Sequence, residues 1–380
     1  RWTPPLPRMR AWLGRAMLVA SSFAATGLAA QVPQQRGTTS DSTRSPRAVL
    51  DSILATPPLS RAHWGVAAYD LADGAPVLVY NEHRLFIAAS TMKLVTAAAA
   101  LDLLGTGHRF DTAVEAVVDT AGRARQLIVR GGGDPSLGAP FHADPLAPLD
   151  SLADSLTAAG LARVDGPIVI DQSRFDSVLV HPAWEGFDLD WYYAAPVAPF
   201  AVMRGAWEVV VRPGRVGEVA RVEVPYGGTL LELDARIRTV PGDDDWDDVL
   251  RRFADTDSLL LRGTIGAGAG PDTSWIAQTR PGRTAGRALR RALERAGIEV
   301  DGPVVVRHAA PEASDEAGSG GASKLRILWR SPPLDTIIRV ALERSDNWVT
   351  EQVLKSTTWP FAPSARGPPR LRNQRSTVSK

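Results

Sequence analysis

The clearest helical pattern in the chain is an apolar, alanine-rich run from Ala88 to Leu101 that carries Ser90 and Lys93 near its start. Alanine, leucine and methionine favour helices, and Ser90 stands where a helix can begin. Residues three apart lie on the same face of a helix, so the two polar side chains are expected to point the same way. The pattern predicts a buried helix that begins near Ser90 and presents a hydroxyl and an amine to one cavity.

Short apolar and polar alternations elsewhere predict strands, and longer periodic runs predict helices. Residues 64–70 and 76–81 are typical of a hairpin with Asp73-Gly74 in its turn. Further strands are expected at residues 110–118, 125–130, 166–171, 207–212, 220–224 and 236–240, and helices at residues 47–54, 148–160 and 283–296. The acidic run at residues 243–248 fits no calcium loop, and we expect a solvated turn that leads into a helix.

A second feature is the stretch 334–355, which predicts one helix, or two interrupted at residues 343–348. Ser345 and Asn347 lie in the interruption, where they can present a hydroxyl and an amide to a neighbouring site. A serine can relay a proton, and an amide can orient the lysine or hold a substrate carbonyl.

The Ser90 and Lys93 pair has a chemical interpretation and a structural one. A serine is a weak nucleophile, but a lysine with its pKa lowered by an apolar environment can accept the serine proton as a general base. The alternative is a capped core helix whose lysine extends to the surface. Only four of the 43 basic residues are lysines, and only Lys93 follows a serine by three positions, which favours the chemical interpretation.

Composition narrows the function classes further. The chain of 380 residues can form two or three domains, and its 44% hydrophobic and 22% charged content is ordinary for globular proteins. A net charge of +1 gives no indication of nucleic-acid binding. The absence of cysteine excludes disulfides, thiolate metal sites and a cysteine nucleophile, and the six histidines have no metal-ligand spacing. We therefore expect no cofactor and no metal.

The N-terminal region predicts export. Arginines at positions 8, 10 and 15 precede an apolar stretch, residues 16–30, that ends in small residues, as in a signal peptide. The alternative is an uncleaved anchor, but the stretch is short and interrupted for a membrane span. Residues 1–30 are expected to form the signal region and residues 31–46 a flexible linker. The mature protein is expected in the periplasm or cell envelope, without a stable membrane span.

Ser90-x-x-Lys93 and Ser345-x-Asn347 together form the signature pair of penicillin-recognising serine enzymes. From about Trp64 to Lys355 the chain resembles the D-alanyl-D-alanine carboxypeptidase/endopeptidase family, the class C low-molecular-mass penicillin-binding proteins. The resemblance rests on residues 85–93, 131–137, 191–197, 331–334 and 345–347.

This resemblance implies an α+β or α/β fold, a β-lactamase/transpeptidase-like domain with a large, mostly β insert between the two motifs. Residues 47–110 and 281–355 would form the catalytic domain, and residues 111–280 the insert. Ser90 would be the acylated nucleophile, Lys93 its base, Ser345 a proton relay and Asn347 a substrate-positioning amide. The implied substrates are peptidoglycan peptides ending in D-Ala-D-Ala or cross-linked through D-amino acids, and β-lactams would acylate the same serine.

The chain departs from the family pattern in its third motif. No Lys-Thr-Gly follows Asn347, and Lys355-Ser356-Thr357 lies too close and lacks the glycine. That strand normally binds the substrate carboxylate and supplies an oxyanion N–H, whose loss costs about 10²–10³ in rate. Residues 356–380 lack periodicity, so we expect a divergent tail, a truncated relative, uncovered apolar surface, low stability and little turnover. Met203-Arg204 replaces the family's usual Asn-containing turn.

Two other functions fit parts of the pattern. A non-catalytic peptidoglycan-binding protein could retain the same scaffold without acylation. A β-lactamase or esterase-like serine hydrolase would use the same serine, but the long insert disfavours it.

Overall fold

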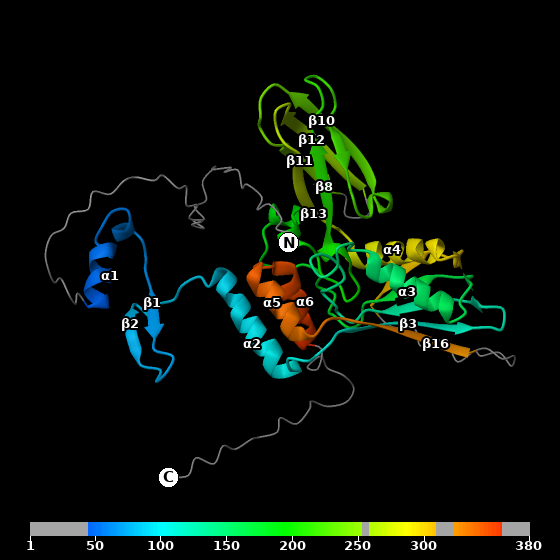
Figure 1. Ribbon diagram of the computed structural model, residues 1–380, viewed down its shortest axis with the longest axis horizontal. Helices are drawn as coiled ribbons and strands as arrows, with labels where there is room; N and C mark the ends of the chain where they lie inside the picture. The colour runs from blue at the N-terminus through cyan, green and yellow to red at the C-terminus, as the bar shows by residue number, and fades with distance from the viewer. Residues whose placement is uncertain (1–44, 253–257, 309–322, 359–380) are drawn as a thin grey trace, which may run out of the picture. The chain divides into compact units, whose positions relative to one another are not determined.

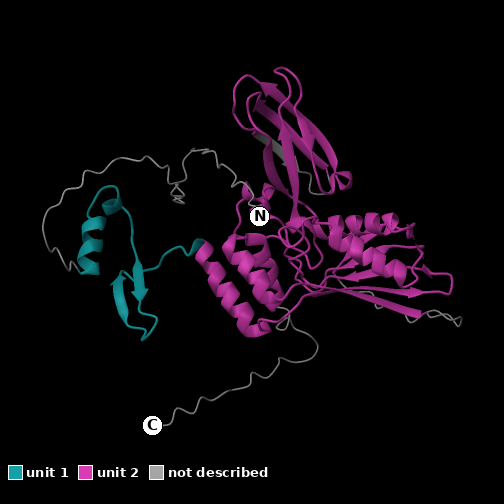
Figure 2. Cartoon of the chain, in the orientation of Figure 1, with its two compact units in different colours: residues 1–89 teal, residues 90–380 magenta. Residues whose placement is uncertain are grey.

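The computed structural model describes residues 45–252, 258–308 and 323–358. The signal region predicted at residues 1–30 lies outside the described residues, as do nearly all of the linker and most of the tail. The chain divides into two compact units, residues 1–89 and 90–380 (Figure 2). Within the described ranges, no helix is both long enough and apolar enough to cross a membrane.

The described residues of unit 1, from residue 45 on, form the α-helix α1 (Pro46–Leu54), a short 3₁₀ helix, η1 (Leu59–Arg61), and the predicted hairpin. Helix α1 begins at Ser45, whose hydroxyl accepts a hydrogen bond from the Ala48 N–H at 3.2 Å. Strands β1 (Val66–Tyr69) and β2 (Pro76–Tyr80) pair antiparallel, which confirms the hairpin. Arg47 lies over the Tyr80 ring at 4.9 Å, so it ties α1 to β2.

Three helices form the layer of unit 2 that carries the predicted motifs (Figure 1). Ser90 lies in a 3₁₀ turn, η2 (Ala89–Thr91), which leads into α2 (Met92–Leu104). Helices α5 (Leu334–Glu343) and α6 (Asn347–Thr358) both pack against α2, which confirms two helices rather than one. The predicted helix at Ser90 is also confirmed, although only one face, with Lys93, Ala97 and Ala100, is buried.

The centre of unit 2 is a mixed eight-stranded sheet. Its strands are β3 (Asp111–Val118), β4 (Arg123–Ala124), β5 (Leu127–Arg130), β6 (Arg163–Val164), β7 (Ile168–Asp171), β14 (Glu299–Val300), β15 (Val304–Arg307) and β16 (Ser323–Arg330). The order is β14-β6-β4-β3-β5-β7-β15, and β16 pairs antiparallel with β3. Helices α3 (Ala147–Ala158) and α4 (Pro281–Arg295) pack on this sheet (Figure 1). Because β16 runs into α5, the sheet fixes where the second motif begins.

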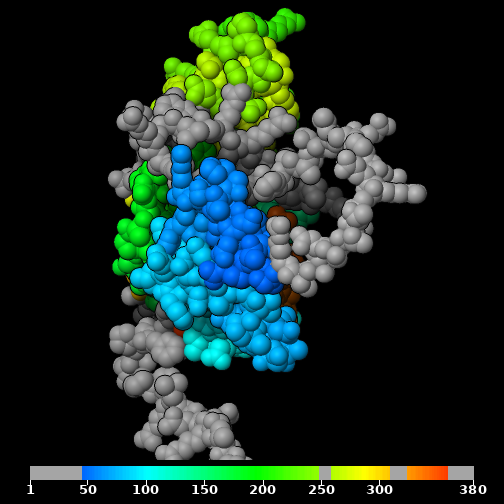
Figure 3. Space-filling model, turned by 90° about the vertical axis from the view of Figure 1, so that its left-hand side faces the viewer, coloured from blue at the N-terminus to red at the C-terminus, as the bar shows by residue number. Residues whose placement is uncertain are grey.

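A β-rich lobe, green to yellow at the top of Figures 1 and 3, contains two three-stranded sheets. One has the order β13-β8-β9 and the other β10-β12-β11. The strands are β8 (Ala206–Arg212), β9 (Arg221–Glu223), β10 (Glu232–Val240), β11 (Asp247–Arg252), β12 (Ser258–Gly266) and β13 (Asp272–Ala277).

The prediction of a helix after the acidic run at residues 243–248 is wrong. Strand β11 begins at Asp247 instead and pairs antiparallel with β12. The indole of Trp246 donates to the Arg262 carbonyl at 2.8 Å, and the Trp246 N–H donates to Asp272 at 3.2 Å. These contacts hold the start of β11 beside β12. Cross-strand pairing therefore outweighs the local helical preference.

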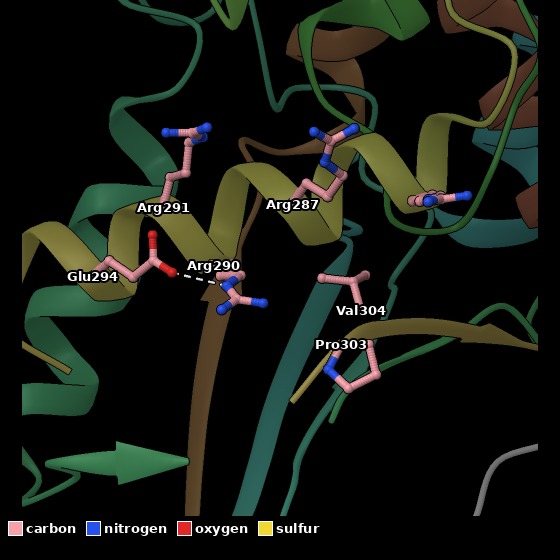
Figure 4. A pocket seen from close by; sticks show the side chains of 7 residues that line it. Arg287, Arg290, Arg291, Glu294, Pro303 and Val304 are labelled. Carbon is pink, nitrogen blue, oxygen red and sulfur yellow. Dashed lines mark hydrogen bonds and ion pairs between the residues drawn. The ribbon is translucent and has the colours of Figure 1, made fainter. Parts of the chain in front are cut away.

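Arg290 fastens α4 to the connection between β14 and β15. Its guanidinium donates to the carbonyls of Val300 at 2.7 Å and Gly302 at 3.0 Å and pairs with Glu294 at 2.8 Å. Arg291 donates to the Thr229 carbonyl at 3.0 Å. Both line a cavity of about 430 Å³ (Figure 4). Since the fold engages these two guanidinium groups, Arg290 and Arg291 have a structural role in this wall of the cavity.

The loop after β5 buries a carboxyl group. Asp134 is fully buried and accepts hydrogen bonds from the Ser136 N–H at 2.7 Å and the Trp329 indole at 3.1 Å. Burial raises the pKa of Asp134 to about 6, because the loss of hydration outweighs the hydrogen bonds that favour the charged form. Asp134 thereby joins the glycine-rich loop to β16.

We predict that ionisation of Asp134 destabilises the fold. The folded state binds this proton more tightly than the unfolded chain, so the stability is present at low pH and is lost as pH rises through the folded pKa of about 6. The free energy of unfolding, relative to Asp134→Asn, should fall by up to about 3 kcal/mol between about pH 4 and pH 7. Urea unfolding followed by tryptophan fluorescence measures it, and a difference independent of pH would contradict it.

Candidate active site

The structure brings Ser90 and Lys93 together as their spacing predicts. Lys93 Nζ lies 2.9 Å from Ser90 Oγ, within hydrogen-bond distance. Ser90 sits on the exposed 3₁₀ turn, whereas Lys93, in the first turn of α2, is only 8% exposed. The nucleophile candidate is therefore accessible while the amine beside it is largely removed from water.

Ser345 completes a group of three side chains. Lys93 Nζ lies 3.4 Å from Ser345 Oγ, across a sequence separation of 252 residues. Ser345 occupies the turn between α5 and α6 with φ of 51°, a left-handed conformation that is uncommon outside glycine. Backbone hydrogen bonds from Ser345 to Leu342 and from Asp346 to Ala341, at 3.2 and 2.8 Å, hold that turn. The strained turn directs the hydroxyl to the lysine.

The environment of Lys93 lowers its pKa and so shifts the equilibrium towards the neutral amine. Burial lowers the pKa of Lys93, and the Asp346 carboxylate opposes this effect by favouring the ammonium. A lowered pKa increases the fraction of amine that can accept a proton near neutral pH. Lys93 can therefore take the proton of either serine that it contacts.

Asn347 is the first residue of α6, and its side chain is held by the backbone of Tyr193. Its Nδ2 donates to the Tyr193 carbonyl at 3.0 Å, and within the described residues its side chain does not hydrogen-bond Ser90, Lys93 or Ser345. In the same part of the chain, no group of three or more histidine, cysteine, aspartate or glutamate residues is placed to hold a metal ion.

Residues 193–204, which we call the clamp segment, hold the turn and the start of α6. The indole of Trp348 donates to the Pro196 carbonyl at 3.0 Å, and the Gln352 amide donates to the Ala198 carbonyl at 3.0 Å. An ion pair joins Arg204 at the end of the segment to Asp346. With the bond from Asn347 to Tyr193, the clamp segment makes four contacts: three to side chains of α6 and one to Asp346, which precedes it.

Sequence reasoning singled out residues 191–197 as a family motif but not their contacts with α6. Those contacts use backbone carbonyls, which every sequence supplies, so no residue type indicated them. Asp346 could have been noticed because it lies between the two motif residues, and Arg204 because it departs from the family pattern.

A family model described as "D-Ala-D-Ala carboxypeptidase 3 (S13) family" matches residues 47–363. The chain belongs to this S13 family. The chain is 32% identical over 263 residues to the D-alanyl-D-alanine carboxypeptidase of Actinomadura sp. (strain R39), covering 67% of this chain and 48% of that protein. It is 22% identical over 300 residues to D-alanyl-D-alanine carboxypeptidase DacB of Haemophilus influenzae, covering 78% and 59%. The S13 chain thus spans about half to three-fifths of the length of these curated relatives.

The fold of the S13 chain is also similar to a solved structure. Penicillin-binding protein 4 (DacB) from Haemophilus influenzae matches with a TM-score of 0.66 and 21% identity, covering 78% of this chain and 62% of that chain. The same protein in complex with a β-lactam matches with a TM-score of 0.62. These matches confirm the predicted penicillin-recognising serine-enzyme fold.

Gly205, next to the clamp segment, provides a test of the packing against α6. Its φ is 65°, and a Cβ there would lie 2.8 Å from Trp348 Nε1 and 3.0 Å from the Pro196 carbonyl oxygen. We expect Gly205→Ala to lower the free energy of unfolding by about 2–4 kcal/mol, from backbone strain and overpacking together.

The matched control is Gly217→Ala, because Gly217 also has a positive φ, 92°, but a Cβ there would meet no atom within 4 Å. It should cost only about 1 kcal/mol, from the backbone alone. Urea unfolding measures both variants, and equal losses would mean that contact with Trp348 does not constrain Gly205.

Proposed function

We propose that this S13 chain is a serine D,D-peptidase that forms an acyl-enzyme on Ser90. The observation that carries the proposal is the position of Lys93 Nζ within 2.9 Å of Ser90 Oγ and 3.4 Å of Ser345 Oγ. A buried amine between two hydroxyls can accept a proton from one serine and pass a proton onward through the other.

The proposed acylation proceeds in one balanced sequence. The Lys93 amine takes the Ser90 proton as Oγ attacks the carbonyl carbon of the bond between the two D-alanines. Collapse of the tetrahedral intermediate breaks the C–N bond, and the departing amine receives a proton from Lys93 through Ser345. Water then hydrolyses the ester and returns Ser90 to its starting state. Asn347, held at the start of α6 by Tyr193, is proposed to position the substrate peptide.

The proposed substrates are peptidoglycan peptides that end in D-Ala-D-Ala or are cross-linked through D-amino acids, as carboxypeptidase and endopeptidase activities require. Membership of the S13 family supports this choice, and the β-lactam complex of a structurally similar protein supports acylation by β-lactams. This substrate class places the proposed site of action in the periplasm or cell envelope.

The 380 residues contain no Lys-Thr-Gly motif, so this chain by itself should acylate slowly. Loss of one oxyanion donor alone costs about 10²–10³ in rate. We therefore propose that turnover by this chain is impaired, while attack by Ser90 remains chemically possible.

A fluorescent penicillin tests the acylation step. We expect a covalent adduct on the wild-type protein, located at Ser90 by peptide mass analysis, and no adduct on Ser90→Ala. Ser345→Ala should lower the acylation rate by about 10²–10⁴, because the proton relay is lost. Ser52→Ala, an exposed serine on α1, is the matched control and should label as the wild type does.

Three results would contradict the proposal. Equal labelling of Ser90→Ala and the wild type would show that Ser90 is not the nucleophile. Absence of any adduct at saturating penicillin, with peptidoglycan-peptide affinity unchanged in Ser90→Ala, would favour a non-catalytic binding protein. Rapid hydrolysis of a chromogenic cephalosporin would instead favour a β-lactamase.

A further inference from the structure

The ion pair between Arg204 and Asp346 adjoins the proposed catalytic group of Ser90, Lys93 and Ser345, because Asp346 follows Ser345 in the chain. The Asp346 side chain is fully buried, and the Arg204 side chain is 24% exposed. Asp346 also accepts a hydrogen bond from the Val349 N–H at 3.0 Å, so it caps α6. The Arg204 guanidinium lies 5.8 Å from the centre of the Tyr192 ring, the residue just before the clamp segment.

Asp346 acts on the proposed base through its charge. Its carboxylate favours the ammonium form of Lys93, which is the form that cannot accept a proton. A buried carboxylate with no cation beside it would exert this effect fully, because little water is present to screen it. The guanidinium of Arg204 supplies the opposite charge at the carboxylate itself.

The other charged groups on the neighbouring helices are exposed or interact with one another. Exposed are Asp102 on α2, Asp335, Arg339 and Glu343 on α5, and Arg344, which ends α5. Lys355 of α6 pairs with Asp176, and Glu351 interacts with His181 and Lys355. Within the described residues, Asp346 is therefore the charged group that acts on Lys93.

We propose that Arg204 is a positioning residue that neutralises Asp346 and thereby keeps the Lys93 amine available as the base for Ser90. Neither Arg204 nor Asp346 needs to touch the substrate, because both act through Lys93. The inference rests on the proposed function, but the charge state of Lys93 can be measured without any acylation.

The chain suits a direct titration because it has only four lysines, Lys93, Lys324, Lys355 and Lys380. In protein labelled with ¹³C at the lysine ε-carbon, each lysine gives one NMR signal, and Lys93→Ala identifies that of Lys93. Arg204→Met should move the Lys93 titration midpoint up by about one pH unit, and Asp346→Asn should move it down. The asparagine can still cap α6, so that variant changes the charge and keeps the hydrogen bond.

Two further variants test whether charge is the cause. Arg204→Lys should return the midpoint close to that of the wild type, because the cation is restored. The double variant Arg204→Met with Asp346→Asn should also lie near the wild type, because both charges are absent. Arg212→Met is the control: Arg212 pairs with Glu223 at 3.3 Å in the β-rich lobe, and its loss should leave the midpoint unchanged.

The acylation rate with penicillin should follow the same shifts, since the acidic limb of its pH profile reports the charge of the base. Movement of the midpoint in the same direction in Arg204→Met and Asp346→Asn, or no movement in either, would overturn the inference and leave the ion pair a structural role. Circular dichroism shows whether Arg204→Met folds. If it does not, the Lys93 midpoints of Asp346→Asn and of the double variant test the inference: a midpoint that does not fall in Asp346→Asn, or a double variant far from the wild type, would overturn it. Opposite midpoint shifts without a penicillin adduct would overturn the proposed function and retain only the effect of Arg204 and Asp346 on the charge of Lys93.

Discussion

The burial of Lys93 between two serines is the constraint on which the site depends. An amine in this position must come within hydrogen-bond distance of Ser90, on the 3₁₀ turn that precedes its own helix, and of Ser345, on a turn distant in the sequence, at 2.9 and 3.4 Å. That requires close packing of α2 against α6. The buried face of α2 uses alanines, Ala97 and Ala100, whose small side chains let the helices approach. The core here also contains Trp348, which is anchored to the clamp segment.

The large sheet and the clamp segment fix the same turn from two directions. The Ser331 hydroxyl accepts a hydrogen bond from the Phe110 N–H at 2.9 Å, and the Leu334 N–H donates to the His108 carbonyl at 2.8 Å. These bonds join the end of β16 and the start of α5 to the chain that follows α2. The clamp segment holds α6 beyond the turn. Ser345 therefore keeps its left-handed backbone because both flanking helices are fixed.

Local sequence was sufficient to predict the elements that carry the chemistry. The spacing of Ser90 and Lys93 predicts their common face, and the interruption at residues 343–348 makes two helices one of the two predicted alternatives, because both features depend on short-range geometry. The helix predicted after the acidic run is not formed, since the strand that begins at Asp247 is stabilised by Trp246 and β12, which local periodicity does not reveal.

The contacts of the clamp segment and the Arg204–Asp346 pair could not be predicted from the sequence, and the reason is related. Their partners meet only through the tertiary fold, and three of the four contacts use backbone carbonyls that carry no residue signature. The role of Asp346 in particular depends on its complete burial, which determines how strongly its charge acts on Lys93.

A crystal structure of the protein after exposure to a β-lactam tests most directly whether Ser90 is the nucleophile. We predict continuous electron density between Ser90 Oγ and the opened lactam carbonyl carbon, with Lys93 and Ser345 still beside the ester. An unmodified Ser90 in a protein saturated with the β-lactam, or an ester on a different residue, would contradict this prediction.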